Sequence, residues 1–332
     1  MIFESLGGIN EHGRNCFLIK SENHQILLDC GLSEEGNLPD FSKIDATKID
    51  ALFVSHSHLD HTGALKEFVK LGFKGKIYLS KPTFECLSFK GFDYEFLSFE
   101  EDKIIFPWLK VKSFRSGHCF GSFSFLIEME DKKILYTGDY LENSIFICDV
   151  LRNIKADLAI IDAAYNDDEL DIVENKKEFL KLLNQEKKIL LPLPKNGRSM
   201  EVISLLNDND LKYQILSNEF FVSEDEKYLR HKVNINNDDD STILLFDDPQ
   251  ITKEDSLQII TSHIDYSLIF TGTIDEGSMA MNLMNNRKNT FFQRINVHQR
   301  IKDAKKLIKE NHFKKVILFH NSYTKEKNKV VF

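Results

Sequence analysis

The stretch from Ala51 to Leu65, ALFVSHSHLDHTGAL, places three histidines and an aspartate within six positions directly after a short apolar run. The apolar run predicts a buried strand whose carboxyl end opens into a loop. Because side chains alternate along a strand, His56 and His58 point to the same side if the chain stays extended, and Asp60 and His61 follow at once. Imidazole nitrogens and carboxylate oxygens are the ligands expected of zinc or a similar metal. The stretch therefore predicts a metal site at a strand-to-helix junction rather than a polar surface loop.

The composition fits a globular protein with enough apolar residues for a core. Its 332 residues, of which 42% are hydrophobic, allow one large domain or two modest ones. No stretch reaches the length of a membrane span, and the first residues lack the basic start and apolar centre of a signal peptide. The five cysteines are scattered without paired spacing, which suits a reducing compartment. We therefore expect a cytoplasmic protein with no membrane partner.

The net charge of −9 gives the molecule as a whole no attraction for nucleic acid. A metal site nevertheless supplies its own positive field, and basic residues can act locally. One local basic set lies near the C-terminal end of the sequence, and it suits a solvated helix face as well as a substrate surface. The set comprises Lys305, Lys306, Lys309, Lys314 and Lys315.

Five more histidines and aspartates stand where later predicted strands end or break. A site built on the rim of a sheet has this pattern, because the ends of several strands meet there. The five are His118 in SGHCFG, Asp139 after KKILYTG, Asp162 in LAIID, His298 after a strand predicted from Phe291 to Val297, and His320 after a strand predicted from Val316 to Phe319.

Two other positions leave two interpretations open. Asp29 ends the strand predicted from Gln25, where it either forms a turn or orients a metal-binding histidine. The loop PKNGRS leads into a helix predicted from Met200 to Leu206. Its Lys195 and Arg198 suit an anion site, whereas Ser199 suits a simple helix cap.

Taken in order, the histidine and aspartate motifs resemble the metallo-β-lactamase fold of binuclear metal hydrolases. The second half is similar to the β-CASP nuclease branch of that fold, which includes RNase J and the endonuclease of messenger-RNA 3′-end processing. The matching segments are IIDAAY, NVHQR, LFHNS, ILLPLPKNGRSMEVISLL and LIFTGTIDEGS. The resemblance implies an α/β protein with a four-layer αββα domain, formed by residues 1–166 and 293–332, and an inserted α/β cap domain at 167–292.

By this resemblance the protein binds two Zn²⁺ ions, with Mn²⁺ as an alternative. The implied ligands are His56, His58 and His118 for one ion, Asp60, His61 and His320 for the other, and Asp139 bridging both. Two ions about 3.5 to 4 Å apart can stabilise both the attacking and the leaving oxygen of a phosphodiester displacement.

The resemblance also implies the remaining roles. Asp60 aligns the attacking water as a base, and His298, supported by Asp162, is the general acid. Asp29 then takes the orienting role beside the ligands. Lys195 and Arg198 are the expected contacts to substrate phosphate.

The expected function is hydrolysis of RNA, with internal cleavage favoured. RNase J has serine and glycine before its first late histidine, forming a 5′-phosphate pocket, whereas this chain has Asn296 and Val297 there. His320 stands where DNA-directed members tend to have valine, which favours RNA as the partner. Alternatives are a hydrolase of a small ester, thioester or phosphodiester, and a non-catalytic RNA-binding relative. Nothing in the sequence indicates oligomerisation.

Overall fold

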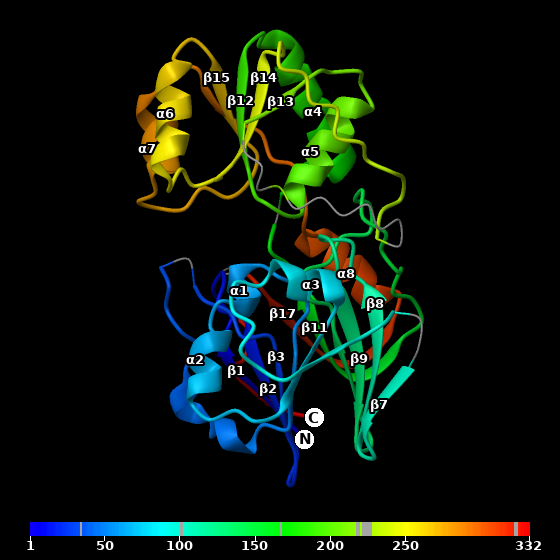
Figure 1. Cartoon of the computed structure of the whole chain (residues 1–332). Helices are drawn as coiled ribbons and strands as arrows, with labels where there is room; N and C mark the ends of the chain where they lie inside the picture. Colours follow the sequence, from blue (N-terminus) through cyan, green and yellow to red (C-terminus); the bar gives the residue numbers. More distant parts are fainter. Residues whose placement is uncertain (34, 100–101, 167, 217–219, 221–227, 322–324) are drawn as a thin grey trace. The chain divides into compact units, whose positions relative to one another are not determined.

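The computed structural model describes residues 1–33, 35–99, 102–166, 168–216, 220, 228–321 and 325–332 (Figure 1). The chain divides into two compact units. Unit 1 comprises Met1–Glu142, Phe146–Asp168 and His298–Phe332, and unit 2 comprises Asn143–Ile145 and Glu169–Val297. The assignment of unit 2 as a β-CASP cap domain stays a prediction.

The first sheet of unit 1 begins as an antiparallel meander and continues with parallel strands. Its strands are apolar runs separated by polar turns. The order is β18-β1-β2-β3-β4-β5-β6. The strands are β1 (Ile2–Gly7), β2 (Cys16–Lys20), β3 (Gln25–Leu28), β4 (Ala51–Phe53), β5 (Lys76–Leu79), β6 (Tyr94–Phe96) and β18 (Lys329–Val331).

The second sheet of unit 1 has the order β17-β11-β10-β9-β8-β7. Strands β10, β11 and β17 are parallel neighbours, so their carboxyl ends lie at one edge. The strands are β7 (Asp102–Phe106), β8 (Leu109–Arg115), β9 (Phe123–Met129), β10 (Lys132–Tyr136), β11 (Lys155–Asp162) and β17 (His312–Phe319). The described helices of unit 1 are η1 (Phe41–Lys43), η2 (Ala46–Lys48), α1 (Leu59–Thr62), α2 (Leu65–Lys70), α3 (Lys81–Cys86) and α8 (Ile301–Lys309).

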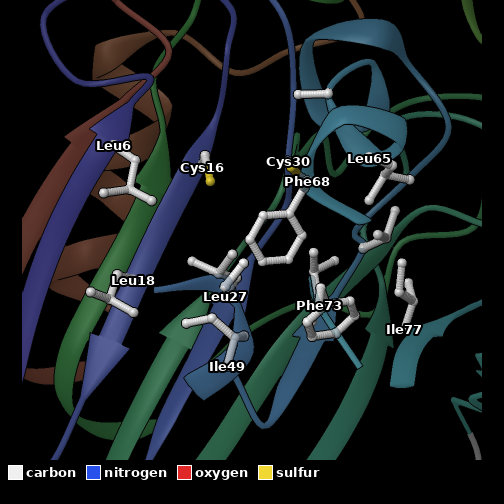
Figure 2. Packing of buried hydrophobic residues seen from close by; sticks show 14 of the residues in the cluster. Leu6, Cys16, Leu18, Leu27, Cys30, Ile49, Leu65, Phe68, Phe73 and Ile77 are labelled. Atoms are coloured by element: carbon white, nitrogen blue, oxygen red, sulfur yellow. The ribbon is translucent and has the colours of Figure 1, made fainter. Parts of the chain in front are cut away.

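The two sheets of unit 1 face each other, and helices cover their outer sides. Between the sheets, the Phe17 ring lies 5.7 Å from Tyr136 and 5.4 Å from Phe319, measured between ring centroids. Figure 2 shows Phe68 of α2 packed in the apolar cluster on the first sheet. Burial of such a side chain stabilises the fold by roughly 1.5–3 kcal/mol. Leu307 of α8 packs likewise in the cluster on the second sheet. The predicted αββα arrangement is therefore confirmed.

Unit 2 is built on a parallel sheet in which strands alternate with helices. The sheet order is β13-β14-β12-β15-β16, and every pairing is parallel. The central strand β12 is apolar and wholly buried, as expected of a sheet covered on both faces. The elements are α4 (Ile172–Gln185), β12 (Ile189–Leu193), α5 (Arg198–Asn207), β13 (Gln214–Ile215), β14 (Ile243–Asp247), α6 (Glu254–Ser262), β15 (Ser267–Phe270), α7 (Met279–Asn286) and β16 (Thr290–Phe292).

One predicted strand is wrong. The strand expected from Phe291 to Val297 ends at Phe292, and residues 293–300 have no regular structure. The chain passes from unit 2 to unit 1 between Val297 and His298, so it cannot continue to pair with β15. Among the described residues, no helix combines the length and apolar character that crossing a bilayer requires.

Candidate metal centre

The predicted ligand side chains gather in unit 1, at the edge where its strands end. His56 and His58 follow β4, and Asp60 and His61 lie in α1. The residues from the second sheet are His118 after β8, Asp139 after β10, Asp162 at the end of β11, and His320 after β17. Because β10, β11 and β17 run parallel, Asp139, Asp162 and His320 emerge side by side.

The short helix α1 is held in place by the loops that flank β2 and β3. Cys30 N donates to His61 O at 2.8 Å, and Asn15 N donates to Asp60 O at 2.8 Å. Gly31 permits this close approach, because a Cβ at that position would lie 1.7 Å from the Asp60 carbonyl oxygen. A helix of four residues is thereby fixed by tertiary hydrogen bonds, since its own length would not stabilise it.

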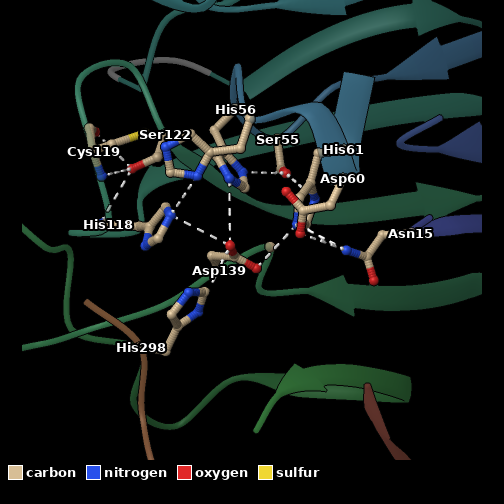
Figure 3. Close-up of polar contacts among 12 residues, drawn as sticks. Asn15, Ser55, His56, Asp60, His61, His118, Cys119, Ser122, Asp139 and His298 are labelled. Atoms are coloured by element: carbon tan, nitrogen blue, oxygen red, sulfur yellow. Dashed lines mark hydrogen bonds and ion pairs between the residues drawn. The ribbon is translucent and has the colours of Figure 1, made fainter. Parts of the chain in front are cut away.

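Asp139 lies at the centre of the cluster, with one carboxylate oxygen toward each group of ligands (Figure 3). Its Oδ2 lies 3.4 Å from His56 Nε2 and 3.3 Å from His118 Nε2. Its Oδ1 lies 3.2 Å from His61 Nε2 and 3.3 Å from His320 Nδ1. The carboxylate is therefore shared between two sets of imidazoles.

Two sets of side chains each offer donor atoms within 4.8 Å of one another. The first consists of His56, His58, His118 and Asp139, and the second of Asp60, His61, Asp139 and His320. These are the two sets implied by the sequence resemblance, with Asp139 common to both.

Several donor atoms of these sets are buried and make no hydrogen bond within the described part of the chain. They are His56 Nε2, His58 Nε2, His320 Nδ1 and both carboxylate oxygens of Asp139. A buried polar atom without a partner costs about 1–3 kcal/mol. Nitrogen and oxygen lone pairs that converge in a buried space can be satisfied by a divalent cation. The residues present therefore fit two divalent ions.

Burial and charge give the two sets different electrostatics. Burial lowers the pKa of His56, and lowers that of His58 to about 3, so both are neutral imidazoles, the form that binds metal. Burial also opposes the charged form of His61, but the carboxylates of Asp139, Asp60 and Asp29 outweigh it and raise its pKa well above the usual value. Burial alone would raise the pKa of Asp139, whereas the surrounding histidines, His61 first, hold it well below its usual range. The second set thus contains an imidazole, His61, whose charged form is favoured by the carboxylates around it.

Asp29 supports the cluster from behind. Its Oδ2 lies 2.7 Å from His61 Nδ1, which leaves Nε2 of that ring for the centre. The carboxylate also accepts hydrogen bonds from Ser55 N and Ser55 Oγ, each at 2.7 Å, and from the Tyr136 hydroxyl. Ser55 Oγ in turn lies 3.0 Å from His56 Nδ1. One buried carboxylate thereby orients histidines of both sets.

His298 stands at the open side of the cluster against Asp162. Its Nδ1 lies 3.2 Å from Asp162 Oδ2, and its side chain is 12% exposed, whereas that of Asp139 is 1% exposed. Backbone amides fix the Asp162 carboxylate, because Tyr140 N and Ala164 N donate to it at 3.1 and 3.0 Å. His298 also forms a third group of possible metal donors with Asp139, Asp162 and His320. Geometry therefore allows His298 two roles, proton donor or ligand.

The sequence model described as the metallo-beta-lactamase superfamily matches residues 9–192, more than half of the chain. This chain belongs to the metallo-beta-lactamase superfamily. Within it, the chain is 32% identical over 233 residues to an RNase J-like protein of Methanocaldococcus jannaschii, covering 61% of this chain and 53% of the relative. It is 29% identical over 240 residues to cleavage and polyadenylation specificity factor 73 of Drosophila melanogaster, covering 61% and 35%.

The similarity extends to another relative and to a solved structure. An endoribonuclease of Mycosarcoma maydis is 26% identical over 248 residues, covering 63% of this chain and 28% of the relative. A crystal structure of a protein of unknown function from Enterococcus faecalis V583 matches with a TM-score of 0.60 and 14% identity, covering 97% and 94%, which shows the fold alone. The chain spans about half or less of the length of the curated relatives it matches. The predicted resemblance to RNase J and the 3′-end-processing endonuclease is confirmed.

Replacing Asp29 tests whether its carboxylate orients the candidate metal ligands. In Asp29→Asn, we expect metal affinity to fall by about 10- to 100-fold, because the amide no longer fixes His61 as the carboxylate does. Asparagine suits the left-handed backbone at this position, where φ is 57°, so backbone strain does not confound the result. Competition with a metal chelator measures the affinity.

Asp29→Ala is the companion variant. It leaves the Ser55, Tyr136 and His61 donors unpaired and should lower the free energy of unfolding of the metal-free protein by about 3–5 kcal/mol, measured in urea. Unchanged metal affinity in Asp29→Asn would contradict the orienting role of the carboxylate.

The two predicted phosphate contacts, Lys195 and Arg198, belong to unit 2, whereas the candidate metal ligands belong to unit 1. Arg198 Nε donates to Ile295 O at 3.1 Å. The alternative that Ser199 caps the following helix is wrong, because α5 begins at Arg198 with Gly197 as its N-cap. Gly197 takes a φ of 87°, so a glycine rather than a hydroxyl side chain starts the helix.

Sequence reasoning missed three polar side chains beside the ligands. Besides Ser55 and Tyr136, Asn15 Nδ2 lies 3.0 Å from His61 Nε2 and 3.3 Å from Asp60 Oδ2. Their sequence neighbours are ordinary strand residues, so spacing gave no signal for Asn15 or Tyr136. Ser55 lies next to His56, and its position inside the motif was the one available signal.

Proposed function

We propose that this protein is a zinc-dependent ribonuclease that hydrolyses phosphodiester bonds within an RNA chain at a two-metal centre. The observation that carries the proposal is Asp139, whose two oxygens face two separate sets of side chains. Each set includes buried nitrogens without a hydrogen-bond partner among the described residues, His56 Nε2 and His58 Nε2 in one and His320 Nδ1 in the other. The names of the relatives, an RNase J-like protein and an endoribonuclease, support RNA as the substrate.

The proposed ligands follow the two sets. We assign His56, His58 and His118 to one zinc ion, Asp60, His61 and His320 to the other, and Asp139 to both. When bound, the two ions supply Lewis-acid charge for the phosphate oxygens and make water available as a nucleophile at neutral pH. Imidazole and carboxylate donors without cysteine suit Zn²⁺ and also accept Mn²⁺.

The protein's own residues position the reactants. Asp60, whose side chain is 26% exposed, orients the attacking water through its carboxylate. His298 donates a proton to the leaving ribose oxygen, and Asp162 keeps its ring oriented. Lys195 and Arg198 bind substrate phosphate, with the guanidinium suited to two oxygens at once.

Internal cleavage is supported by the residues before His298. Asn296 is buried, and its Oδ1 accepts a hydrogen bond from Asn175 Nδ2 at 2.5 Å. A side chain engaged in this way is not presented to the 5′-phosphate of a substrate end. This arrangement supports cleavage that does not depend on the 5′ end.

Zinc analysis and end-labelled RNA test the function together. We expect about two zinc ions per chain by elemental analysis, from the ligand count. RNAs with a 5′-hydroxyl, monophosphate or triphosphate should give the same internal products, because no 5′-phosphate contact is required. Mononucleotides released only from the monophosphate RNA would contradict internal cleavage. Hydrolysis of esters or thioesters without RNA cleavage would favour the small-substrate alternative.

A further inference from the structure

Helix α8 presents an unneutralised basic face. Its apolar residues Ile301, Ala304 and Leu307 are buried against the second sheet of unit 1. The opposite face carries four exposed lysines at positions i, i+3, i+4 and i+7, which form one stripe along a helix. They are Lys302, Lys305, Lys306 and Lys309, and we call them the α8 lysine face.

The two acidic residues at the ends of α8 already pair with arginines. Asp303 accepts hydrogen bonds from Arg300, with Nε at 2.8 Å, and Glu310 pairs with Arg152 at 2.5 Å. None of the four lysines forms an ion pair with any residue that the structure describes. Several lysines elsewhere in unit 1 are paired, for example Lys110 with Asp102 at 2.7 Å. The α8 lysine face is therefore a local concentration of positive charge on a protein whose net charge is −9.

The position of α8 connects this face with the metal centre. The helix begins three residues after His298. Gln299 Nε2 donates to Asp162 O at 2.6 Å, and Ile301 N donates to Asn166 O at 2.8 Å, so the first turn is fixed to the segment that holds the proposed acid. Nine helical residues extend about 13 Å from this point. The lysines therefore lie on the same unit as the metal centre, on a helix that starts beside the proposed acid.

We propose that the α8 lysine face binds the sugar-phosphate backbone of the RNA strand outside the bond that is cleaved. This inference rests on the proposed function, because it takes the strand at the metal centre to be RNA. Flexible ammonium groups bind phosphate without reading sequence, so the contact strengthens binding and does not select a sequence.

The test is Lys305→Gln/Lys306→Gln, with Lys66→Gln/Lys74→Gln as the matched control. All four lysines are exposed in unit 1, and the control pair lies on the α2–β5 side with no ion pair to described residues, so both pairs remove the same charge. Fluorescence anisotropy measures binding of a single-stranded RNA of about 20 nucleotides, in an Asp139→Asn background that prevents cleavage. Hydrolysis of bis(p-nitrophenyl) phosphate is measured with Asp139 intact, because this small ester does not extend to α8.

The α8 pair should weaken RNA binding by about tenfold at 0.1 M salt and reduce the salt slope of log K by about 1.4, as two lost phosphate contacts require. The control pair should change the affinity less than about twofold, and neither pair should alter ester hydrolysis. Equal loss in both pairs, or no loss in either, would overturn the inference. If the wild type cleaves RNA but the α8 pair binds RNA as tightly as the unsubstituted protein, the α8 lysine face is not an RNA-binding surface, and the proposed function stands. If the wild type binds RNA through the α8 lysine face but does not cleave it, the proposed ribonuclease function is wrong, and the binding surface stands.

Discussion

Asp139→Ala should abolish RNA cleavage, with a loss of about a thousandfold or more, and should lower the metal content. The physical reason is the position of the carboxylate, whose oxygens lie 3.2–3.4 Å from His56, His61, His118 and His320. Removing it takes a ligand from both metal sets at once and deletes the negative charge that holds two cations close together.

The companion variant Asp139→Asn keeps the shape and removes the charge, so it separates loss of the ligand from loss of the fold. Circular dichroism and thermal unfolding should report an intact fold for Asp139→Asn. Asp131→Ala, which removes an exposed carboxylate at the turn between β9 and β10, is the control for net charge and should retain full activity. Unchanged turnover in either Asp139 variant would remove this residue from the mechanism.

His298→Ala should reduce RNA cleavage by about 10²- to 10⁴-fold, the usual worth of a general acid, while both metals stay bound. The ring is placed for this role by Asp162, which lies 3.2 Å from Nδ1 and is itself fixed by two backbone amides. An unprotonated ribose oxygen is a poor leaving group, so cleavage of RNA needs the proton that His298 donates.

Bis(p-nitrophenyl) phosphate separates the two roles that geometry allows His298. Its nitrophenolate leaves without a proton, so His298→Ala should hydrolyse this ester at nearly the wild-type rate. His312→Ala is the matched control, because His312 is the first residue of β17, at the end of the strand opposite to His320. It should leave the hydrolysis rates of both substrates unchanged. Loss of one metal, with equal loss on both substrates, would show that His298 is a ligand instead of an acid.

The clustering of the candidate ligands at the strand ends could be predicted because each position is marked by local sequence. An apolar run that ends in a histidine or an aspartate places that side chain at a strand end, as for Asp139 and His320. The supporting residues could not be predicted in this way. Tyr136 reaches Asp29 from the other sheet, and Asn15 reaches His61 from a loop 46 residues away, so these contacts arise from the packing of strands alone.

The predictions that failed concern places where the chain changes direction. Apolar residues from Phe291 to Val297 indicated one strand, but the chain crosses between the units within two residues of Asn296, and pairing stops first. Serine is a residue type that favours the N-cap position of a helix. Here, however, Gly197 is the N-cap of α5, with a positive φ, so the helix begins before Ser199. In both cases tertiary geometry decided between structures that local propensity allows equally.

The order in which the ligands occur along the chain also bears on its synthesis. Once residue 139 has been made, His56, His58, His118 and Asp139 are all present, whereas Asp60 and His61 wait for His320 at the end of β17. Unit 2 and α8 must be translated in between. The second donor set can therefore form only after His320 has been made, much later than the first. For the proposed ribonuclease, a chain truncated before His320 would therefore keep only the first donor set.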